Sequence, residues 1–275
     1  MATLSYGHVI TNGTKIHYYR TGDEKPPVIL LHGFSDNGFS WSRLAVKLEP
    51  YFDLILVDQR GHGLSEAPEN GYTQRDRARD IAGLISELKI AKPVIIGHSF
   101  GAETAVLTAA YYPKMVNSLI LEEPPFWDEG VRQPERDRNE IALEEKEKIK
   151  SRKNKTLMEL MQISEEKHPN WDEKDHFHWG KARQQVKPQI TNGLLQQEKT
   201  WREYCKDVKC PILVVLGEPQ FGSIVSEKTA NELPKIWKRK AKILQTSGAG
   251  HHIHREQMDT FNEAIKSFLR KQTGW

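Results

Sequence analysis

The sequence predicts an α/β protein with a mostly parallel, doubly wound sheet and a helical cap inserted after the sixth strand. Short apolar runs recur along the 275 residues, and longer segments with helical periodicity separate them. Between residues 126 and 201 the apolar runs stop. Strands that alternate with helices are typical of a parallel sheet covered by helices on both faces.

The first two strands are expected to form a hairpin at the edge of the sheet. Residues 8–11 and 15–20 flank Asn12-Gly13, a dipeptide that favours a two-residue turn between antiparallel strands. The other strands are continuous apolar runs rich in β-branched residues, as in strands buried on both faces. These runs occupy residues 28–31, 54–57, 93–96, 119–121, 212–216 and 241–244.

Helical patterns are expected at residues 73–88, 99–112 and 256–271. The segment 126–201 is charged and helical in character, with aromatic and methionine residues among its charges. We therefore expect a core made of residues 1–125 and 202–275, and a cap made of residues 126–201.

The composition excludes several classes of protein. Hydrophobic residues make up 37% and charged residues 28%, which excludes a disordered chain and a membrane bundle. No run approaches the ~20 apolar residues of a membrane span. Lys plus Arg number 40 and Asp plus Glu 37, spread along the chain, which argues against a nucleic-acid partner.

The N-terminal residues and the two cysteines indicate the cellular compartment of the protein. No secretory signal is visible at the N-terminus. Cys205 and Cys210 lack the neighbouring ligands of a zinc site, and we expect two reduced thiols in a cytoplasmic protein.

The sharpest motif is G-H-S-F-G at residues 97–101, between an apolar strand and an Ala-rich helix. This context is the one required for a nucleophile elbow, which would present Ser99 at the carboxyl end of the sheet. A structural tight turn is the alternative interpretation.

A serine hydroxyl needs a base to take its proton. His251 is the preferred candidate because it directly follows a Gly-Ala-Gly turn after the last strand-like run. We expect His252 and His254, in the same loop, to be surface or packing residues.

The oxyanion formed on attack needs N–H donors at about 3 Å. We expect one from the backbone of Phe100, after the nucleophile, and one from the backbone of Phe34, after the strand at 28–31. His32 is expected to brace that loop rather than to act in catalysis.

Four motifs together resemble the α/β-hydrolase superfamily. They are H-G-F at 32–34, D-Q-R-G-H-G-L-S at 58–65, G-H-S-F-G at 97–101 and G-H at 250–251. Their order along the chain is also that of the family, with the cap as the variable part. The resemblance implies a serine-nucleophile hydrolase, and it gives Asp58 a structural rather than a catalytic role.

The third catalytic residue departs from the family pattern. Gln220 stands where such hydrolases usually carry an Asp, and an amide cannot balance the charge of a protonated histidine. Glu123 follows the strand at 119–121, an acid placement similar to that of certain haloalkane dehalogenases and the zearalenone-type lactonases. Glu123 is therefore our preferred acid, with Glu122, Glu218 and a dyad without an acid as alternatives.

The expected function is hydrolysis of carboxylic esters of small to medium apolar substrates through an acyl-enzyme. Alternatives are a lactonase, a carbon-carbon bond hydrolase, a proline aminopeptidase, or a receptor derived from a hydrolase. The expected partner is a small-molecule ester or lactone, without a metal, an organic cofactor or a membrane span, and the sequence favours no oligomeric state. We expect four residues of the cap segment to bind substrate: Trp127, Met158, Met161 and Trp179.

Overall fold

The computed structural model describes residues 4–22, 24–127, 138–196 and 198–275, and these contain one eight-stranded sheet of order β1-β2-β4-β3-β5-β6-β7-β8. β1 and β2 are antiparallel to their neighbours, and the other strands are parallel. The strands are β1 (Ser5–Thr11), β2 (Thr14–Arg20), β3 (Pro27–Leu31), β4 (Asp53–Asp58), β5 (Val94–His98), β6 (Ser118–Glu122), β7 (Ile212–Leu216) and β8 (Ala241–Gln245).

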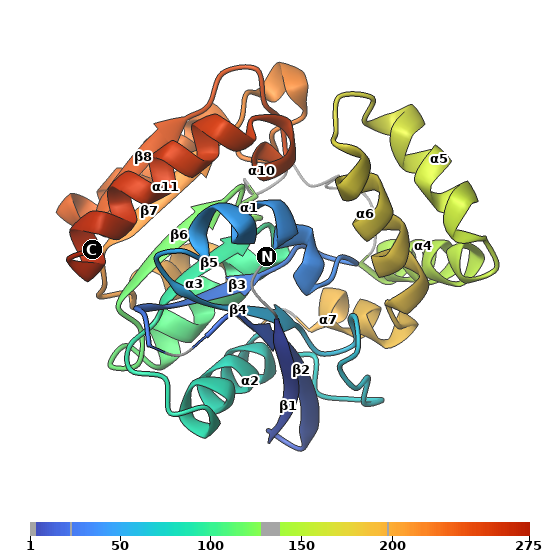
Figure 1. Ribbon diagram of the computed structural model, residues 1–275, viewed down its shortest axis with the longest axis horizontal. Coiled ribbons are helices and arrows are strands. Elements are labelled where there is room, and N and C mark those ends of the chain that lie inside the picture. The colour runs from blue at the N-terminus through green and yellow to red at the C-terminus, as the bar shows by residue number, and fades with distance from the viewer. Residues whose placement is uncertain (1–3, 23, 128–137, 197) are drawn as a thin grey trace.

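Helices cover both faces of this sheet (Figure 1). The core helices are η1 (Gly38–Trp41), α1 (Ser42–Leu48), α2 (Gln74–Glu87), α3 (Phe100–Tyr111), α8 (Trp201–Cys205), η3 (Pro219–Phe221), α9 (Glu227–Trp237), η4 (Lys238–Lys240), α10 (Ile253–Glu256) and α11 (Met258–Thr273). The predicted fold class is confirmed. Helices α1 and α9 were not expected from the sequence.

Side-chain alternation in the strands builds two apolar layers. Ile29 and Leu31 of β3 face one layer, with α2, α3, α8 and α9. Val28 and Leu30 face the other layer, with α1 and α11. Both faces of the central strands are therefore buried, which explains why these strands are continuous apolar runs in the sequence.

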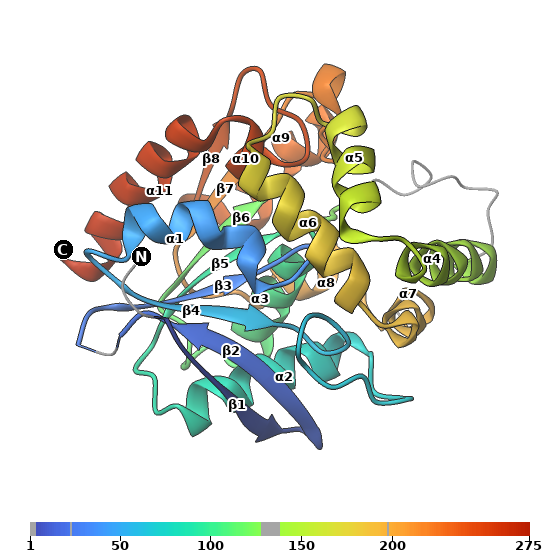
Figure 2. The same ribbon diagram turned by 45° about the vertical axis from the view of Figure 1, so that its right-hand side comes forward.

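The cap helices lie together on one side of the molecule, beyond the carboxyl ends of the parallel strands (Figure 2). They are α4 (Arg138–Lys153), α5 (Leu157–Lys167), α6 (Glu173–Gln185), η2 (Pro188–Thr191) and α7 (Asn192–Leu195). The expected cap range also includes residues 128–137 and 197, which lie outside the described residues. Trp201, at the end of that range, packs in the core on Phe126.

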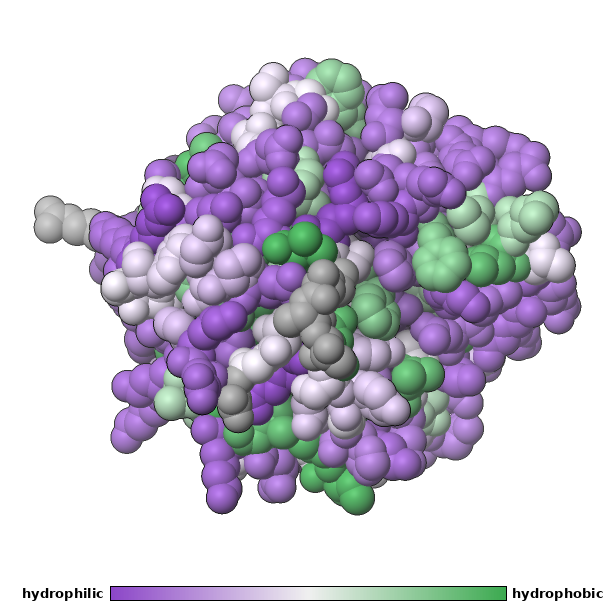
Figure 3. Space-filling model, in the orientation of Figure 1, coloured by the Kyte–Doolittle hydropathy of each residue, from purple (hydrophilic) through white to green (hydrophobic). Residues whose placement is uncertain are grey.

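The face shown in Figure 3 is mostly hydrophilic, with small separate hydrophobic patches. Among the described residues, no helix is both long and apolar enough to span a membrane.

Candidate active site

Ser99 stands on a sharp turn between β5 and α3. Its φ of 51° and ψ of −117° lie outside the regions that side-chain-bearing residues usually adopt. A Cβ at Gly97 would lie 2.4 Å from the Gly101 carbonyl oxygen, and one at Gly101 would lie 2.2 Å from that of Leu31. The turn therefore requires glycine on both sides of Ser99, and such strain is concentrated at functional sites.

Ser99 opens into a cavity of about 330 Å³ between the core and the cap. Phe34 and Phe100 line it on the core side, and Ile141 and Leu194 line it from α4 and α7. The cavity also has a polar end. Within the described ranges, neither the Phe34 nor the Phe100 amide donates to a loop or side-chain acceptor, and their role as oxyanion donors stays a prediction.

The polar end of the cavity is formed by Gln74, Arg77 and Glu103. Arg77 Nη2 donates to Glu103 Oε2 at 2.8 Å, and Gln74 Nε2 donates to Glu103 Oε1 at 3.2 Å. Burial would raise the pKa of Glu103, but the charge of Arg77 and the hydrogen bonds from Arg77, Gln74 and Tyr204 together lower it. The cavity thus ends in a charged but internally neutralised pair, in which Arg77 of α2 meets Glu103, one helical turn after Ser99 in α3.

His251 lies beside Glu123. Its Nδ1 is 3.5 Å from Glu123 Oε2. The Glu123 carboxylate is fully buried, and it accepts hydrogen bonds from the Gly217 amide at 2.8 Å, the Ser223 hydroxyl at 2.8 Å and the Ile224 amide at 2.7 Å. These donors fix the carboxylate next to the imidazole, as the third member of a triad requires.

The structure brings His251 to the neighbourhood of Ser99 through the preceding residue. His98 Nε2 donates to the His251 carbonyl at 2.8 Å, and the two imidazole centroids are 4.7 Å apart. Among the described residues, no hydrogen bond joins the Ser99 hydroxyl to the His251 ring. Catalytic hydrogen bonds are often long without substrate, so the pairing of Ser99 with His251 stays a prediction.

The other proposed acids lie elsewhere. Glu218 accepts from the Gly248 amide at 2.7 Å and from the Ser247 hydroxyl at 3.4 Å, at the exposed side of the loop that carries His251. Gln220 is exposed in η3. Glu123 is thus the acid that the structure brings to His251.

Glu122 points away from His251 and pairs with His254. Its two oxygens lie 2.9 and 2.8 Å from His254 Nδ1, and Oε1 also accepts from the His254 amide at 2.8 Å. Burial raises the pKa of Glu122 to about 7 and lowers that of His254 to about 3. His254 is therefore neutral and fully buried, which agrees with packing, one of the two roles expected for it.

His98, Glu122 and His254 are the described residues best placed to hold a metal ion, with ligand atoms within 4.8 Å of one another. However, Glu122 and His254 already bond each other, and His98 Nε2 bonds the His251 carbonyl. Hydrogen bonding within the protein accounts for this grouping.

The expected substrate-binding residues separate into two groups. Trp127 lines the cavity. Met158 does not, because it is 80% exposed at the start of α5. Trp179 is buried against Leu160 in a cluster within the cap, and Met161 is also absent from the cavity lining. The cap helix α6 buries one face against its neighbours, and Trp179 lies on that buried face.

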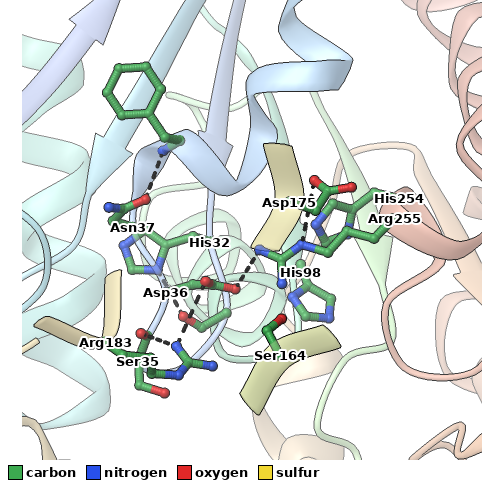
Figure 4. Close-up of polar contacts among 12 residues, drawn as sticks. His32, Ser35, Asp36, Asn37, His98, Ser164, Asp175, Arg183, His254 and Arg255 are labelled. Carbon is green, nitrogen blue, oxygen red and sulfur yellow. Dashed lines mark hydrogen bonds and ion pairs between the residues drawn. The ribbon is translucent and has the colours of Figure 1, made fainter. Parts of the chain in front are cut away.

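A buried charged network holds the loop after β3, which carries Phe34, between core and cap (Figure 4). Asp36 lies 3.1 Å from Nη2 of Arg255 and 3.8 Å from Nη1 of Arg183 in α6. Arg183 also donates to the Ser35 carbonyl. Burial would raise the pKa of Asp36, but the charges of both arginines hold it well below its usual range.

Sequence reasoning did not find the polar end of the cavity. Glu103 follows Ser99 by one helical turn, so the expected helix over 99–112 carried the signal for that residue. Nothing in the local sequence indicated Arg77 or Gln74, because α2 meets α3 only in the folded chain.

A family model of the alpha/beta hydrolase fold matches residues 26–257. The chain therefore belongs to the alpha/beta hydrolase family, as its motifs, sheet order and serine turn led us to expect.

Curated relatives are similar over part of the chain. One segment of 95 residues is 44% identical to 2-(acetamidomethylene)succinate hydrolase of Mesorhizobium japonicum and covers 34% of each protein. A segment of 127 residues is 34% identical to N-formylmaleamate deformylase of Pseudomonas putida, over 46% of this chain and 47% of that protein. The matched segments thus span between a third and a half of these relatives.

Solved structures are similar over nearly the whole chain. E-2-(acetamidomethylene)succinate hydrolase superimposes with a TM-score of 0.80 at 24% identity, covering 97% of this chain and 99% of that one. Est816, described as an N-acyl homoserine lactone degrading enzyme, gives 0.73 at 23% identity, over 95% and 100%. At these identities the likeness shows the fold alone.

Proposed function

We propose that this alpha/beta hydrolase cleaves small to medium carboxylic esters through an acyl-enzyme. The observation that carries the proposal is the strained Ser99 turn at the wall of the cavity, which directly follows His98, the residue that bonds the backbone of His251. The names of the similar proteins support hydrolysis without selecting an ester, and a lactone remains within the same chemistry.

In the proposed reaction the Ser99 hydroxyl attacks the acyl carbon while His251 takes its proton. The amides of Phe34 and Phe100 bind the oxyanion, and Glu123 balances the charge on His251. The alcohol leaves with the proton from His251. Water, deprotonated by the same histidine, then attacks the acyl-enzyme and releases the acid and Ser99.

The polar end of the cavity refines the substrate class. Apolar side chains line the cavity near Ser99, while Glu103 follows one helical turn later in α3 and Arg77 reaches it from α2. An acyl group with a short apolar part and a distal hydrogen-bonding group fits this arrangement. An aminopeptidase is less well supported, because Glu103 is paired with Arg77 at 2.8 Å and Glu145, the other cavity carboxylate, with Lys148 at 2.7 Å.

The test is turnover of a series of p-nitrophenyl esters of increasing acyl length, with and without a terminal hydroxyl. Multiple turnovers that depend on Ser99, and that fall once the acyl group outgrows the cavity, are expected. A slow single turnover followed by stable ligand retention would instead indicate a receptor derived from a hydrolase. Release of proline from proline amides without ester turnover would indicate the aminopeptidase.

A further inference from the structure

Two adjacent glutamates at the end of β6 hold two histidines of one loop. Glu123 faces His251, and Glu122 faces His254, three residues further along. Glu123 has a φ of 46°, which ends the strand and turns its side chain towards His251. Glu122 is still within β6, so its side chain points to the opposite face of the sheet.

On that opposite face Glu122 meets His98. The two residues are register partners in β5 and β6, so their side chains leave the sheet on the same side. His254 completes this group, and the Trp41 indole packs on it with ring centroids 4.5 Å apart. His98, Glu122 and His254 are all nearly or fully buried, in the layer that also contains Trp41 and Phe261.

Each of these groups bonds the chain around His251. His98 donates to the carbonyl of His251 itself, at 2.8 Å. Glu122 accepts from both the amide and Nδ1 of His254, at 2.8 Å or little more. By contrast, the contact between the His251 ring and Glu123 is 3.5 Å long. The backbone around His251 is therefore held more tightly than its imidazole.

A buried polar pair in an apolar layer is weak evidence for stability, because desolvation offsets its attraction. We therefore look for the role of the Glu122–His254 pair in the backbone geometry that the pair fixes. We propose that the Glu122–His254 pair positions His251, by fixing the chain directly after it so that the imidazole lies within reach of both Ser99 and Glu123. This inference rests on the proposed serine-hydrolase function.

The test measures ester turnover per active site in Glu122→Gln. A glutamine at this position keeps one oxygen for the His254 amide, but it places an N–H group against the Nδ1–H group of His254 where Glu122 Oε2 now accepts. The loop must shift, and a displacement of the base by a fraction of an ångström is expected to lower kcat about 10-fold with KM unchanged. Titration with a serine-reactive phosphonate counts the folded, reactive sites. The kcat is then calculated per active site, so that a smaller amount of folded protein does not lower it.

If Glu122→Gln folds poorly, a second pair of variants, H254N and H254L, tests the positioning role of the Glu122–His254 pair. Asparagine at 254 places an N–H group where Nδ1–H of the histidine lies, whereas leucine offers none. We expect H254N to retain most of the kcat per site and H254L to lose about 10-fold. Glu218→Gln is the matched control, because Glu218 also binds this loop but at its exposed side.

Unchanged kcat per titrated site in both E122Q and H254L would overturn the positioning role while leaving the hydrolase intact. Hydrolysis that persists in Ser99→Ala would instead refute the proposed function. Activity that is lost on treatment with EDTA and restored by Zn²⁺ would assign His98, Glu122 and His254 to a metal, and would also overturn this inference.

Discussion

The core and the cap hold their side chains around the cavity by different means. In the core, Ser99 and Glu123 both adopt positive φ at the ends of adjacent strands, and backbone hydrogen bonds to Glu122 and Val215 fix their amides at 2.9 and 3.1 Å. The cap is joined to the core largely by side chains, as in the ion pair of Arg183 with Asp36, with a backbone hydrogen bond from the Lys187 amide to the Gly61 carbonyl at 2.8 Å. The proposed catalytic residues thus stand at strand ends that backbone hydrogen bonds fix, whereas the cap contributes side chains to the cavity wall.

The largest effect is expected where the core is most constrained. Ser99→Ala removes the proposed nucleophile and should lower kcat/KM at least ~10⁴-fold, since the residual rate then comes from binding and the oxyanion donors alone. Ester turnover measures it, and an unchanged melting temperature shows that the fold is kept. Retention of a tenth of the activity would remove Ser99 from the mechanism.

The next effect separates the two acids proposed from the sequence. Glu123→Gln leaves a protonated His251 without its counter-charge and should lower kcat about 10³-fold. Glu218→Gln, at the exposed side of the same loop, should change kcat by less than about twofold. Equal small losses in the two variants would exclude Glu123 as the acid.

Breaking the contact between cap and core should cost stability. In Arg183→Met the buried Asp36 keeps Arg255 as its one close cationic partner among the described residues, and the free energy of unfolding should fall by about 3 kcal/mol. Lys181→Met, on the exposed side of the same helix, is the control. Urea denaturation compares the stabilities of the two variants. Identical midpoints would show that the Arg183–Asp36 ion pair between cap and core does not stabilise the protein.

The buried histidines of the core give its stability a pH dependence. Burial lowers the pKa of His254 to about 3, below its ordinary value of 6.5, so protons bind to the unfolded chain first as the pH falls. His254 therefore contributes stability above pH 6.5 that is lost towards pH 3, with a slope of about 1.4 kcal/mol per pH unit. Between pH 6 and pH 4, the free energy of unfolding of H254N should change with pH by about 1.4 kcal/mol per pH unit less than that of the unchanged protein. Parallel curves of the two proteins would contradict this prediction.

The smallest effect should come from the cap segment. Trp127→Ala enlarges the cavity and should shift the preferred acyl length, with a change of about 10-fold in relative kcat/KM across the ester series. Met158→Ala, at an exposed position, should leave the series unchanged. A shift in both variants would mean that the cap moves over the cavity during turnover.

Local patterns in the sequence predicted most of the core. Periods of two and 3.6 residues are set by each segment itself, so the strands and the helices α2, α3 and α11 were found. α1 was missed because it has only seven residues, and α9 because Pro234 interrupts its pattern. The serine turn was found because its glycines are adjacent to Ser99 in the chain.

The sequence by itself determined the fold class, the nucleophile turn and the candidate acids, because each depends on residues that are neighbours in the chain. Only the tertiary structure decided that Glu123 meets His251, that Glu122 meets His254, and that Trp127 rather than Met158 faces the cavity. Those contacts join residues that lie far apart in the chain, or depend on which side of a helix is buried. Such choices are made by packing between elements, and no local pattern contains them.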